Sequence, residues 1–582
     1  METKEITLQI DRHSITVPAG TTILEAATEI GINIPTLCHI DLKGTCIKNN
    51  PASCRICVVE VEGRRNLAPA CATKCTEGMV VRTSTLRVMN ARKVVAELIL
   101  SDHPNDCLTC PKSGNCELQN LALRFNVREM PFNGGELSLR KREVTSSIVR
   151  NMDKCIFCRR CESVCNDVQT VGALGAVRRG FNTTIAPAFD KKMSESECTY
   201  CGQCVAVCPV GALTERDHTN RLLEDLDNPD KVVIVQTAPA VRVALGEEFG
   251  MPAGTQVTGK MVYALRELGF NYVFDTDFAA DLTIMEEGTE VLERLGRFLN
   301  GDKNVCLPIL TSCCPAWVNF FEHHFPDLLD IPSTARSPQQ MFGAVLKEEA
   351  RNNKKDTRKT VVVSIMPCTA KKAEILRPEH KTEGEQDVDF VLTTTEVIRM
   401  IKEAGIDLAQ MPWEAMDMPF GLSSGAGVIF GVSGGVTEAV LRRLVEDSGM
   451  EALNEIKFTG IRGTDGIKEA VIPYGDRQIK IAVVSGLKNA DELIQKIKSG
   501  EVQYDFVEVM ACRRGCMAGG GQPVPIGART KAARYEGLYR IDDASQIKRS
   551  NDNPIVGELY EGLLKGKEHK LLHNNSDLPQ AK

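Results

Sequence analysis

The chain has 582 residues and a formal net charge of −7, from 77 acidic and 70 basic side chains. This length predicts about three to five domains, and a hydrophobic content of 43% is ordinary for a protein with packed cores. The near balance of charge gives no basic stripe, so nucleic acid is not an expected partner. The segment Met1–Ile6 lacks a basic region followed by an apolar run, so no secretory signal is expected.

The 23 cysteines are the part of the composition that bears most on function. In a long chain without a secretory signal they indicate metal or redox chemistry in a reducing cytoplasm, rather than disulfides. Residues 418–437 carry no charge, but they include six glycines and three serines. This stretch therefore favours a buried glycine-rich loop over a membrane helix, and no membrane insertion is expected.

Residues 1–82 are expected to form a β-grasp, ferredoxin-like domain. Two short strands, 6–10 and 15–17, flank a turn, and a helix is predicted over 22–30 with Gly31 at its end. The domain contains four cysteines that suit a [2Fe–2S] cluster or a structural zinc ion: Cys38, Cys54, Cys57 and Cys71. The iron motifs that follow in the chain favour the cluster.

Two further cysteines of this region stand outside the proposed set. Cys46 lies in the long gap after Cys38, and we take Cys38 as the ligand and Cys46 as the spare, with the reverse left open. Cys75 is expected to be a small buried apolar residue.

Residues 83–144 are expected to form a small helical domain with one histidine and three cysteines at metal-ligand spacing. A helix is predicted over 87–100, and the ligand candidates follow it: His103, Cys107, Cys110 and Cys116. Imidazole and thiolate both bind iron, so the set suits a His-ligated [4Fe–4S] cluster. A structural zinc ion bound by the same four residues is the alternative.

Residues 145–224 contain two runs of the C-x2-C-x2-C-x3-C type, the most specific local signal in the chain. In two-cluster ferredoxins the fourth cysteine of each run ligates the other cluster. The predicted sets for two [4Fe–4S] clusters are Cys155, Cys158, Cys161 and Cys208, and Cys198, Cys201, Cys204 and Cys165. A two-cluster ferredoxin-like α+β domain is therefore expected here.

Residues 225–527 are expected to form an α/β domain. Buried strands are predicted over 231–235, 360–365 and 481–484, with helices between them. Ligands in α/β domains lie at the carboxyl ends of strands. Cys368 directly follows the second of these strands, so a cofactor ligand is expected there.

Three cysteine-containing segments of this domain carry a resemblance to a known family. They are Thr311–Trp317, Met366–Glu374 and Met510–Pro523. Together they resemble the catalytic signature of the iron-only ([FeFe]) hydrogenases, and the resemblance extends over nearly the whole chain. It implies a composite cofactor, the H-cluster, in which a [4Fe–4S] cubane is joined to a di-iron unit with CO, cyanide and a bridging dithiolate.

The resemblance assigns residues to this cofactor. The implied cubane ligands are Cys314, Cys368, Cys512 and Cys516, with Cys516 also bridging to the di-iron unit. Lys371 is implied as a charged donor to cyanide. Further residues are implied to surround the di-iron unit: Pro239, Ala240, Gln339, Met366, Met510, Gly519, Gly520 and Gly521.

A proton path is also implied. Cys313 is the motif cysteine that is not a ligand in the family, and its thiol is placed to carry protons to and from the di-iron unit. The matching positions toward the surface are Glu287, Glu290, Arg294 and Ser333. Without the resemblance, these acids would be interpreted as a solvated helix face.

Two features depart from the family pattern or stand apart from it. Arg513 and Arg514 occupy positions where the family favours small residues, and we expect both side chains to point to solvent or a partner rather than to tune the cubane. Cys306 precedes an apolar run and is expected to be a core residue.

Residues 528–582 resemble the C-terminal segment of the family, which is a separate small subunit in some members.

The predicted function is that of a cytoplasmic iron-only hydrogenase catalytic subunit, with one [2Fe–2S] and three accessory [4Fe–4S] clusters. No dinucleotide-binding motif is present, so we expect an NAD(P)-linked, electron-bifurcating complex. Its partners would be a flavoprotein subunit, a small [2Fe–2S] subunit and ferredoxin, and maturation enzymes would supply the H-cluster. The alternatives are a free-standing ferredoxin hydrogenase, a non-catalytic electron carrier, and an iron–sulfur assembly or hydrogen-sensing protein.

Overall fold

The computed structural model describes residues 4–42, 47–49, 52–134, 142–302, 305–353, 355–444, 462, 466–474, 477–524 and 528–574. They divide into two compact units. The first contains Met1–Asp167, Gly172–Ser196 and Val207–Thr214, and the second contains Val168–Val171, Glu197–Ala206 and Glu215–Lys582. Within the described part of the chain, no helix has the length and apolar character needed to cross a membrane.

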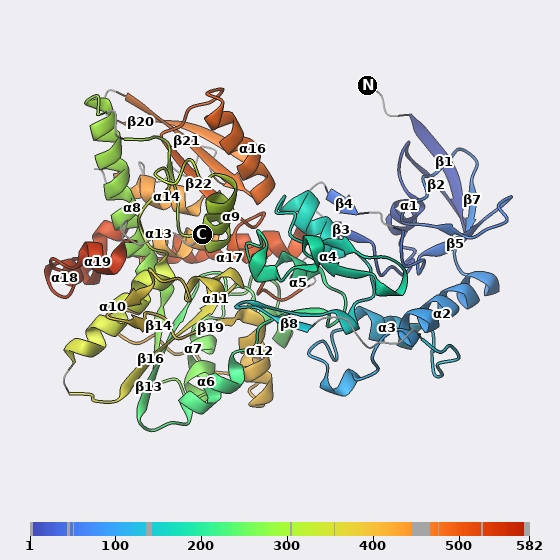
Figure 1. Ribbon diagram of the computed structural model, residues 1–582, viewed down its shortest axis with the longest axis horizontal. Helices are drawn as coiled ribbons and strands as arrows, with labels where there is room; N and C mark the ends of the chain where they lie inside the picture. Colours follow the sequence, from blue (N-terminus) through green and yellow to red (C-terminus); the bar gives the residue numbers. More distant parts are fainter. Residues whose placement is uncertain are drawn as a thin grey trace. The chain divides into compact units, whose positions relative to one another are not determined.

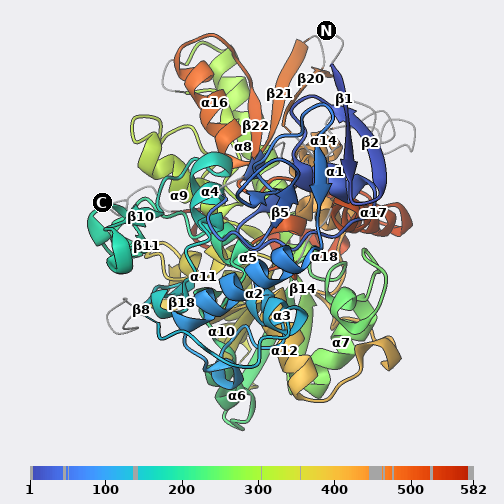
Figure 2. The ribbon, with the colours of Figure 1, turned by 90° about the vertical axis from the view of Figure 1, so that its right-hand side faces the viewer.

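A five-stranded sheet with the order β2-β1-β7-β5-β6 begins the first unit. Figure 2 shows its strands β1, β2 and β5. Its strands are β1 (Glu5–Ile10), β2 (His13–Pro18), β5 (Val58–Val61), β6 (Ala68–Pro69) and β7 (Val80–Arg82). The predicted hairpin is confirmed, because β1 and β2 pair antiparallel, while β1 and β7 pair parallel. The predicted helix is α1 (Ile23–Glu29), which Thr22 and Glu25 cap reciprocally and which Gly31 follows at φ +76°.

The rest of the first unit combines helices with short strands, and it carries His103 and the remaining cysteines of this unit. The helix predicted over 87–100 is present as α2 (Leu86–Ser101), and α3 (Glu117–Arg124) follows it. Further on there is a three-stranded sheet with the order β12-β9-β8 and a hairpin of two strands. These strands are β8 (Arg142–Val144), β9 (Ile148–Asn151), β10 (Gly175–Val177), β11 (Thr184–Ala186) and β12 (Leu213–Glu215).

Two four-stranded sheets organise the second unit (Figure 1). One has the order β14-β13-β16-β19 and is parallel throughout: β13 (Lys231–Thr237), β14 (Tyr272–Asp275), β16 (Lys359–Met366) and β19 (Phe390–Thr393). The other has the order β15-β22-β21-β20: β15 (Ile309–Leu310), β20 (Ile467–Tyr474), β21 (Arg477–Ser485) and β22 (Phe506–Met510). In the second sheet only β20 runs antiparallel.

The strands predicted over 231–235 and 360–365 are neighbours in the first sheet, as their continuous apolar sequences suggest. The third, over 481–484, belongs to the second sheet instead. Helices α13 (Gly425–Val428) and α17 (Ala528–Ala544) lie between the two sheets in Figure 1.

The uncharged, glycine-rich stretch 418–437 is buried from residue 424 onward, whereas Met418 and Pro419 are exposed, and much of it is helical rather than a loop. It contains α13, a short turn of helix and the start of α14 (Gly435–Leu444), which pack against the long helix α8 (Thr276–Leu299). A Cβ on Gly427 would lie 2.3 Å from the carbonyl oxygen of Asp277, so only glycine allows this close approach. The buried carboxylate of Asp281 on α8 accepts hydrogen bonds from the backbone and hydroxyl of Ser424.

The C-terminal segment is part of the second unit's core. It contains α17, α18 (Pro554–Glu561) and α19 (Glu568–Leu572). The buried guanidinium of Arg534 on α17 pairs with Glu247 at 2.6 Å and donates to the carbonyl oxygen of Met517 at 3.0 Å. Asn553 ahead of α18 donates to Asp281 at 3.0 Å. The segment therefore supports the loop that carries the third cysteine motif.

Replacement of Arg442 by methionine should destabilise the second unit strongly. Its guanidinium pairs with Asp542 at 2.7 Å and with Glu438 at 2.5 Å, and all three side chains are at most 1% exposed. Without Arg442, Arg462 still pairs with Glu438 at 2.6 Å but lies 3.9 Å from Asp542. The buried carboxylate of Asp542 therefore loses its close cation, which costs about 3–5 kcal/mol. We expect the midpoint of thermal unfolding to fall by several degrees. Lys402→Met, which breaks an exposed pair with Glu248, is the control and should cost about 0–1 kcal/mol. Equal effects of the two substitutions would contradict this assignment.

Candidate metal centre

The three cysteine motifs and one further turn come together because each directly follows a parallel strand. Residues 238–240 follow β13, 311–317 follow β15, 366–374 follow β16, and 510–516 follow β22. The carboxyl ends of parallel strands meet at one edge of a sheet. The two sheets thus bring four loops from distant parts of the sequence to one place.

These loops, with α8, α10 (Pro338–Asn352) and the short helical turn η9 (Ile429–Gly431), line a cavity of about 80 Å³. At about 10–15 Å³ for each water-sized sphere, it has room for several diatomic groups. Ten residues predicted from the sequence line it: Pro239, Ala240, Cys313, Cys314, Gln339, Met366, Cys368, Lys371, Met510 and Cys516. Phe430, Pro338 and Ala280 complete a mostly apolar wall.

Four buried thiols converge on one side of this cavity. Cys314, Cys368 and Cys516 line it directly. Charge on any of these three raises the pKa of Cys512, which places the fourth thiol beside them. Burial raises the pKa of all four, to about 12 for Cys516.

This donor set fits an iron–sulfur cubane. Thiolates are the iron ligands, and in so buried a place they would stay protonated unless a cation were bound. Among the described residues, no group of three or more His, Cys, Asp or Glu side chains is arranged to hold a single metal ion. A cubane makes no such demand, because each thiolate binds a different iron atom.

Lys371 is oriented toward the cavity by the carboxylate of Glu374, a residue that was not predicted from the sequence. Its ammonium pairs with Glu374 at 3.0 Å and donates to the carbonyl oxygen of Cys313 at 3.2 Å. Glu374 also accepts from the side-chain amide of Gln339 at 2.9 Å. One buried carboxylate on α11 (Ala370–Glu374) therefore orients both Lys371 and Gln339. Its i,i+3 spacing from Lys371 was the available signal.

The predicted role of the glycine run needs a correction. Gly519, Gly520 and Gly521 do not line the cavity. A Cβ on Gly519 would lie 2.2 Å from the carbonyl oxygen of Pro367, and one on Gly520 would lie 2.6 Å from that of Cys201. The glycines thus let this loop pack against other backbone segments rather than against the di-iron unit.

Two further expectations are wrong. Arg514 is buried, with its backbone N–H donating to the hydroxyl of Ser485 at 2.7 Å, and Arg513 is half-buried with its stem against Gly486. Neither side chain is simply exposed to solvent, because the loop turns inward after β22. Cys306 is exposed although it precedes an apolar run, since the buried strand begins only at Ile309.

Glu287 is the predicted proton carrier nearest to Cys313. Its side chain is fully buried, and one carboxyl oxygen accepts from the backbone N–H of Ser312 at 3.3 Å. The other oxygen has no hydrogen-bond partner. Burial raises the pKa of Glu287 to about 8, with smaller contributions from Glu290 and Glu508. The group can therefore hold or release a proton near neutral pH.

The outer part of the predicted path is a connected network. The hydroxyl of Ser333 donates to Glu290 at 2.6 Å, and Glu290 pairs with Arg294 at 2.5 Å. Glu287, Glu290 and Arg294 lie on one face of α8. No direct hydrogen bond joins Glu287 to Ser333 among those of the described residues, so the predicted path needs water or a mobile group at that step.

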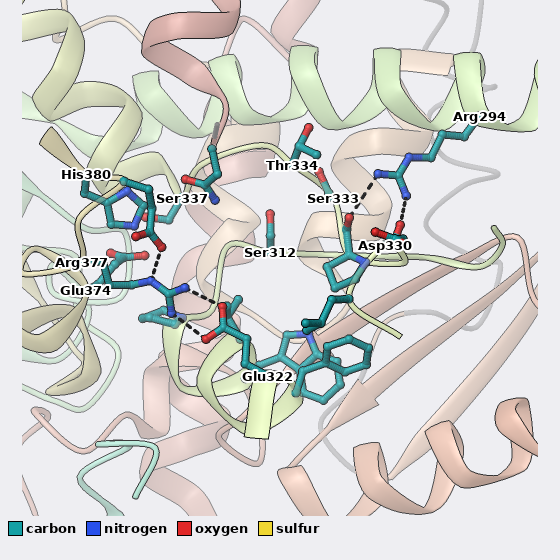
Figure 3. Close-up of a pocket in the computed structure, with 18 residues that line it drawn as sticks. Arg294, Ser312, Glu322, Asp330, Ser333, Thr334, Ser337, Glu374, Arg377 and His380 are labelled. Carbon is teal, nitrogen blue, oxygen red and sulfur yellow. Dashed lines mark hydrogen bonds and ion pairs between the residues drawn. The ribbon is translucent and has the colours of Figure 1, made fainter. Parts of the chain in front are cut away.

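A second cavity, of about 300 Å³ and with many polar side chains in its lining, borders this network. Ser312, Ser333 and Arg294 line one part of it, and Glu374 and His380 line another. Figure 3 shows Arg377 paired with Glu322 on one side and Arg294 on the other, with Ser312 between them. This cavity gives the predicted proton carriers access to water.

In the first unit, the predicted [2Fe–2S] cysteines lie together. The thiol of Cys38 is within hydrogen-bonding reach of Cys54 and Cys71, and Cys57 is within reach of Cys71. Cys46 lies outside the described residues. Cys75 is buried nearby in the same hydrophobic core, and burial raises its pKa to about 11.

The predicted one-histidine, three-cysteine set also converges. A small cavity is lined by His103, Cys107, Cys110 and Cys116. Burial lowers the pKa of His103, which favours the neutral imidazole that binds metals, and its Nδ1 has no hydrogen-bond partner. At the edge of this site, the ammonium of Lys154 donates a hydrogen bond to Cys110 and forms an ion pair with Asp106 at 3.1 Å.

The two ferredoxin-like runs divide between the units. Cys155, Cys158, Cys161 and Cys208 belong to the first unit, and the charges of Cys155 and Cys208 both raise the pKa of Cys158. Cys198, Cys201 and Cys204 belong to the second unit, whereas Cys165 belongs to the first.

Family models match successive parts of the chain. Residues 231–520 match "Iron only hydrogenase large subunit, C-terminal domain", and residues 528–575 match "Iron hydrogenase small subunit". Residues 3–85 match a 2Fe-2S iron-sulfur cluster binding domain. Residues 92–131 and 145–214 match an iron-sulfur binding region and a ferredoxin-like domain of NADH-quinone oxidoreductases. These iron–sulfur descriptions favour iron over zinc in the N-terminal part.

Individual proteins give the same indication. The chain is 55% identical over 576 residues to "NADP-reducing hydrogenase subunit HndD" of Solidesulfovibrio fructosivorans, with 98% of each chain covered. It is 36% identical to "Iron hydrogenase 1" of Clostridium pasteurianum, over 95% of this chain and 96% of the other. Among solved structures, apo [FeFe]-hydrogenase HydA1 from Chlamydomonas reinhardtii is similar with a TM-score of 0.52 and 39% identity, covering 62% of this chain and 98% of that one.

The carboxyl of Glu287 should titrate near pH 8. Its pKa is raised from 4.5 to about 8, so between these values the folded chain keeps a proton that the unfolded chain releases. This group therefore makes stability fall as pH rises through that window. A protonated-carboxyl infrared band, identified by its loss in Glu287→Gln, should disappear as pH rises through about 8. Loss of that band already below pH 5 would contradict the assignment.

Proposed function

The chain belongs to the iron-only hydrogenases and is an oxidoreductase that acts on hydrogen; we propose that the cavity between its two sheets is where hydrogen is formed and split. One observation carries this proposal. The thiols of three separate motifs, Lys371 and Gln339 all border a single, mostly apolar cavity next to four converging cysteines. An electron carrier has no need for such a cavity beyond its cluster ligands.

We propose that Cys314, Cys368, Cys512 and Cys516 hold the cubane of the H-cluster, and that Cys516 also holds the di-iron unit inside the cavity. When bound, that cofactor supplies the open iron position at which hydrogen is split heterolytically. Lys371 offers a charged donor to its cyanide, and Gln339 offers an amide. Met366, Met510, Pro239 and Ala240 exclude water from it.

Protons are exchanged by residues of the chain. Cys313 carries the proton at the cavity, and Glu287, which the backbone N–H of Ser312 holds in place, receives it. Water carries the proton on to Ser333 and Glu290, and Arg294, which lines the second cavity, holds Glu290. The raised pKa of Glu287 suits a group that must both accept and release protons.

Electrons leave through accessory clusters, for which we propose one [2Fe–2S] and three [4Fe–4S] centres. The proposed ligands are the four sets predicted from the sequence. For Cys165 the proposal rests on the spacing of the two cysteine runs alone.

We also propose that the chain works in a cytoplasmic complex that transfers electrons to NADP⁺ and ferredoxin. The relative with 55% identity is named as a subunit of an NADP-reducing hydrogenase. Because the chain has no dinucleotide-binding motif of its own, a flavoprotein subunit must bind NADP⁺, with a small [2Fe–2S] subunit beside it. Maturation enzymes would supply the di-iron unit. A free-standing ferredoxin hydrogenase is the second candidate, favoured by the similarity to "Iron hydrogenase 1".

Infrared spectroscopy tests the catalytic proposal. Protein purified anaerobically from a host with the maturation enzymes should show bands of metal-bound CO and cyanide that shift under hydrogen. Cys516→Ala should lose them. Cys313→Ala should keep them but lose about 10²–10⁴-fold in turnover, because a proton carrier is removed. Cys306→Ala, at an exposed cysteine that does not line the cavity, is the control and should retain both bands and turnover. Absence of the bands from the wild type would leave an electron carrier or assembly protein.

The proposed complex predicts a division of activity. Hydrogen-dependent reduction of NADP⁺ should require the flavoprotein that co-purifies with the native protein. The isolated chain should reduce ferredoxin or an artificial acceptor but not NADP⁺. Isolation of the native chain without any flavoprotein, with full ferredoxin activity, would favour the free-standing enzyme instead.

A further inference from the structure

The loop that carries Cys198, Cys201 and Cys204 packs directly against the loop of the active-site cysteines. Both belong to the second unit. Gln203, the first residue of α5 (Gln203–Val207), stands between two of the proposed accessory-cluster ligands. Its side-chain Nε2 lies 3.3 Å from the sulfur of Cys512 and 3.0 Å from the carbonyl oxygen of Ala518.

The chemistry of these two contacts fixes the orientation of the amide. The carbonyl oxygen of Ala518 can only accept a hydrogen bond, and the thiolate of Cys512 can only accept one. The NH₂ end of Gln203 satisfies both at once, whereas the flipped amide would face them with an acceptor. The hydrogen bond to sulfur therefore follows from the partners and not from an arbitrary choice of amide orientation.

The surrounding backbone is packed too closely for any side chain to separate the two loops. A Cβ on Gly520 would lie 2.6 Å from the carbonyl oxygen of Cys201, and one on Gly202 would lie 2.2 Å from the hydroxyl of Thr369. That hydroxyl donates to the carbonyl oxygen of Tyr200 at 2.7 Å. The charge of Cys201 also raises the pKa of Cys512, so the two thiols are close enough to interact.

We propose that Gln203 is a positioning residue that links the adjacent accessory cluster to the active-site cubane and sets the cubane's reduction potential. The inference rests on the proposed function, because it requires Cys512 to be a cubane ligand. A hydrogen bond to a cluster thiolate stabilises the reduced, more negative state and so raises the potential. The same side chain is the shortest hydrogen-bonded connection from the Cys201–Cys204 segment to Cys512 among the described residues.

Removal of the donor should lower the potential of the cubane selectively. In Gln203→Leu we expect the one-electron equilibrium of the cubane to shift about tenfold toward the oxidised state, which corresponds to about 59 mV. Gln203→Glu keeps the shape of the side chain but places a carboxylate at the thiolate, so it should shift the equilibrium in the same direction. The reduction potentials of the accessory clusters should change less than that of the cubane.

The measurement is a spectroelectrochemical titration of the full-length protein produced without maturation enzymes, in which the cubane is followed by electron paramagnetic resonance. Thr369→Val is the matched control, because it removes a hydrogen bond from the same junction without touching the sulfur of Cys512. A lowered cubane potential in both Gln203 variants, with Thr369→Val at the wild-type value, supports the proposal. A wild-type cubane potential in either Gln203 variant, or the same shift in Thr369→Val, overturns it.

Failure of this inference is distinguishable from failure of the proposed function. An unchanged potential in the Gln203 variants, in a protein that turns over hydrogen after maturation, would overturn the role of Gln203 alone. Absence of any cubane signal from the wild type would overturn the cysteine set and this inference together.

Discussion

The proposed cubane places one electrostatic constraint on the second unit, which is that four thiolates must be charged in a place where burial opposes their charge. Burial raises the pKa of Cys314, Cys368, Cys512 and Cys516. Only a bound cation can stabilise the thiolates there. A metal site of this kind therefore demands rigid support, because no solvent can relax around a misplaced charge.

The fold supplies that support from two sheets. Each motif begins where a parallel strand ends, so the position of its cysteine is set by the hydrogen bonds of a sheet. The C-terminal segment adds a second layer of support, since Arg534 holds the carbonyl oxygen of Met517 next to Cys516. Buried Glu508 accepts from the backbone N–H groups of Gly434 and Thr437 at 2.7 Å and so fixes the glycine-rich segment that closes the cavity. The small-subunit-like segment is thus a structural part of the site.

Proton transfer faces the opposite constraint, because its carriers must change charge. Glu287 is fully buried and lacks a compensating cation, which is why its pKa is raised. Glu290, only a turn away on α8, is paired with Arg294, which lines the second cavity. One helix therefore carries both a buried carboxyl without a cation and an ion-paired carboxyl. The proposed proton path uses these two different environments.

Much of the site was predictable because its signals are local. Cysteines at fixed spacing after apolar strands identified the ligand candidates, and the structure gathers Cys38 with its three partners and His103 with its three. Gln203 and Glu508 were missed because their roles arise from contacts between segments far apart in the sequence. Glu374 was missed because a carboxylate in a helix is common and does not stand out. Cys306 and Arg514 were misjudged since residue type and neighbouring apolarity do not determine where a loop turns.

The glycine run, residues 519–521, also shows that the sequence does not reveal contacts between distant segments. Gly519, Gly520 and Gly521 were correctly singled out as positions of close approach, but the sequence could not say what approaches them. The structure supplies backbone partners: Pro367 for Gly519 and Cys201 for Gly520. The requirement for glycine is thus explained by packing between loops.

The most direct test of the account is an iron-edge anomalous diffraction map of crystals of the matured protein. The account predicts one cluster of iron density bonded to Cys314, Cys368, Cys512 and Cys516, and two more iron atoms inside the cavity beside Cys516, Lys371 and Cys313. Iron confined to the cysteines, with no iron in the cavity of a protein that received its maturation enzymes, would contradict the claim that this cavity is the site of hydrogen chemistry.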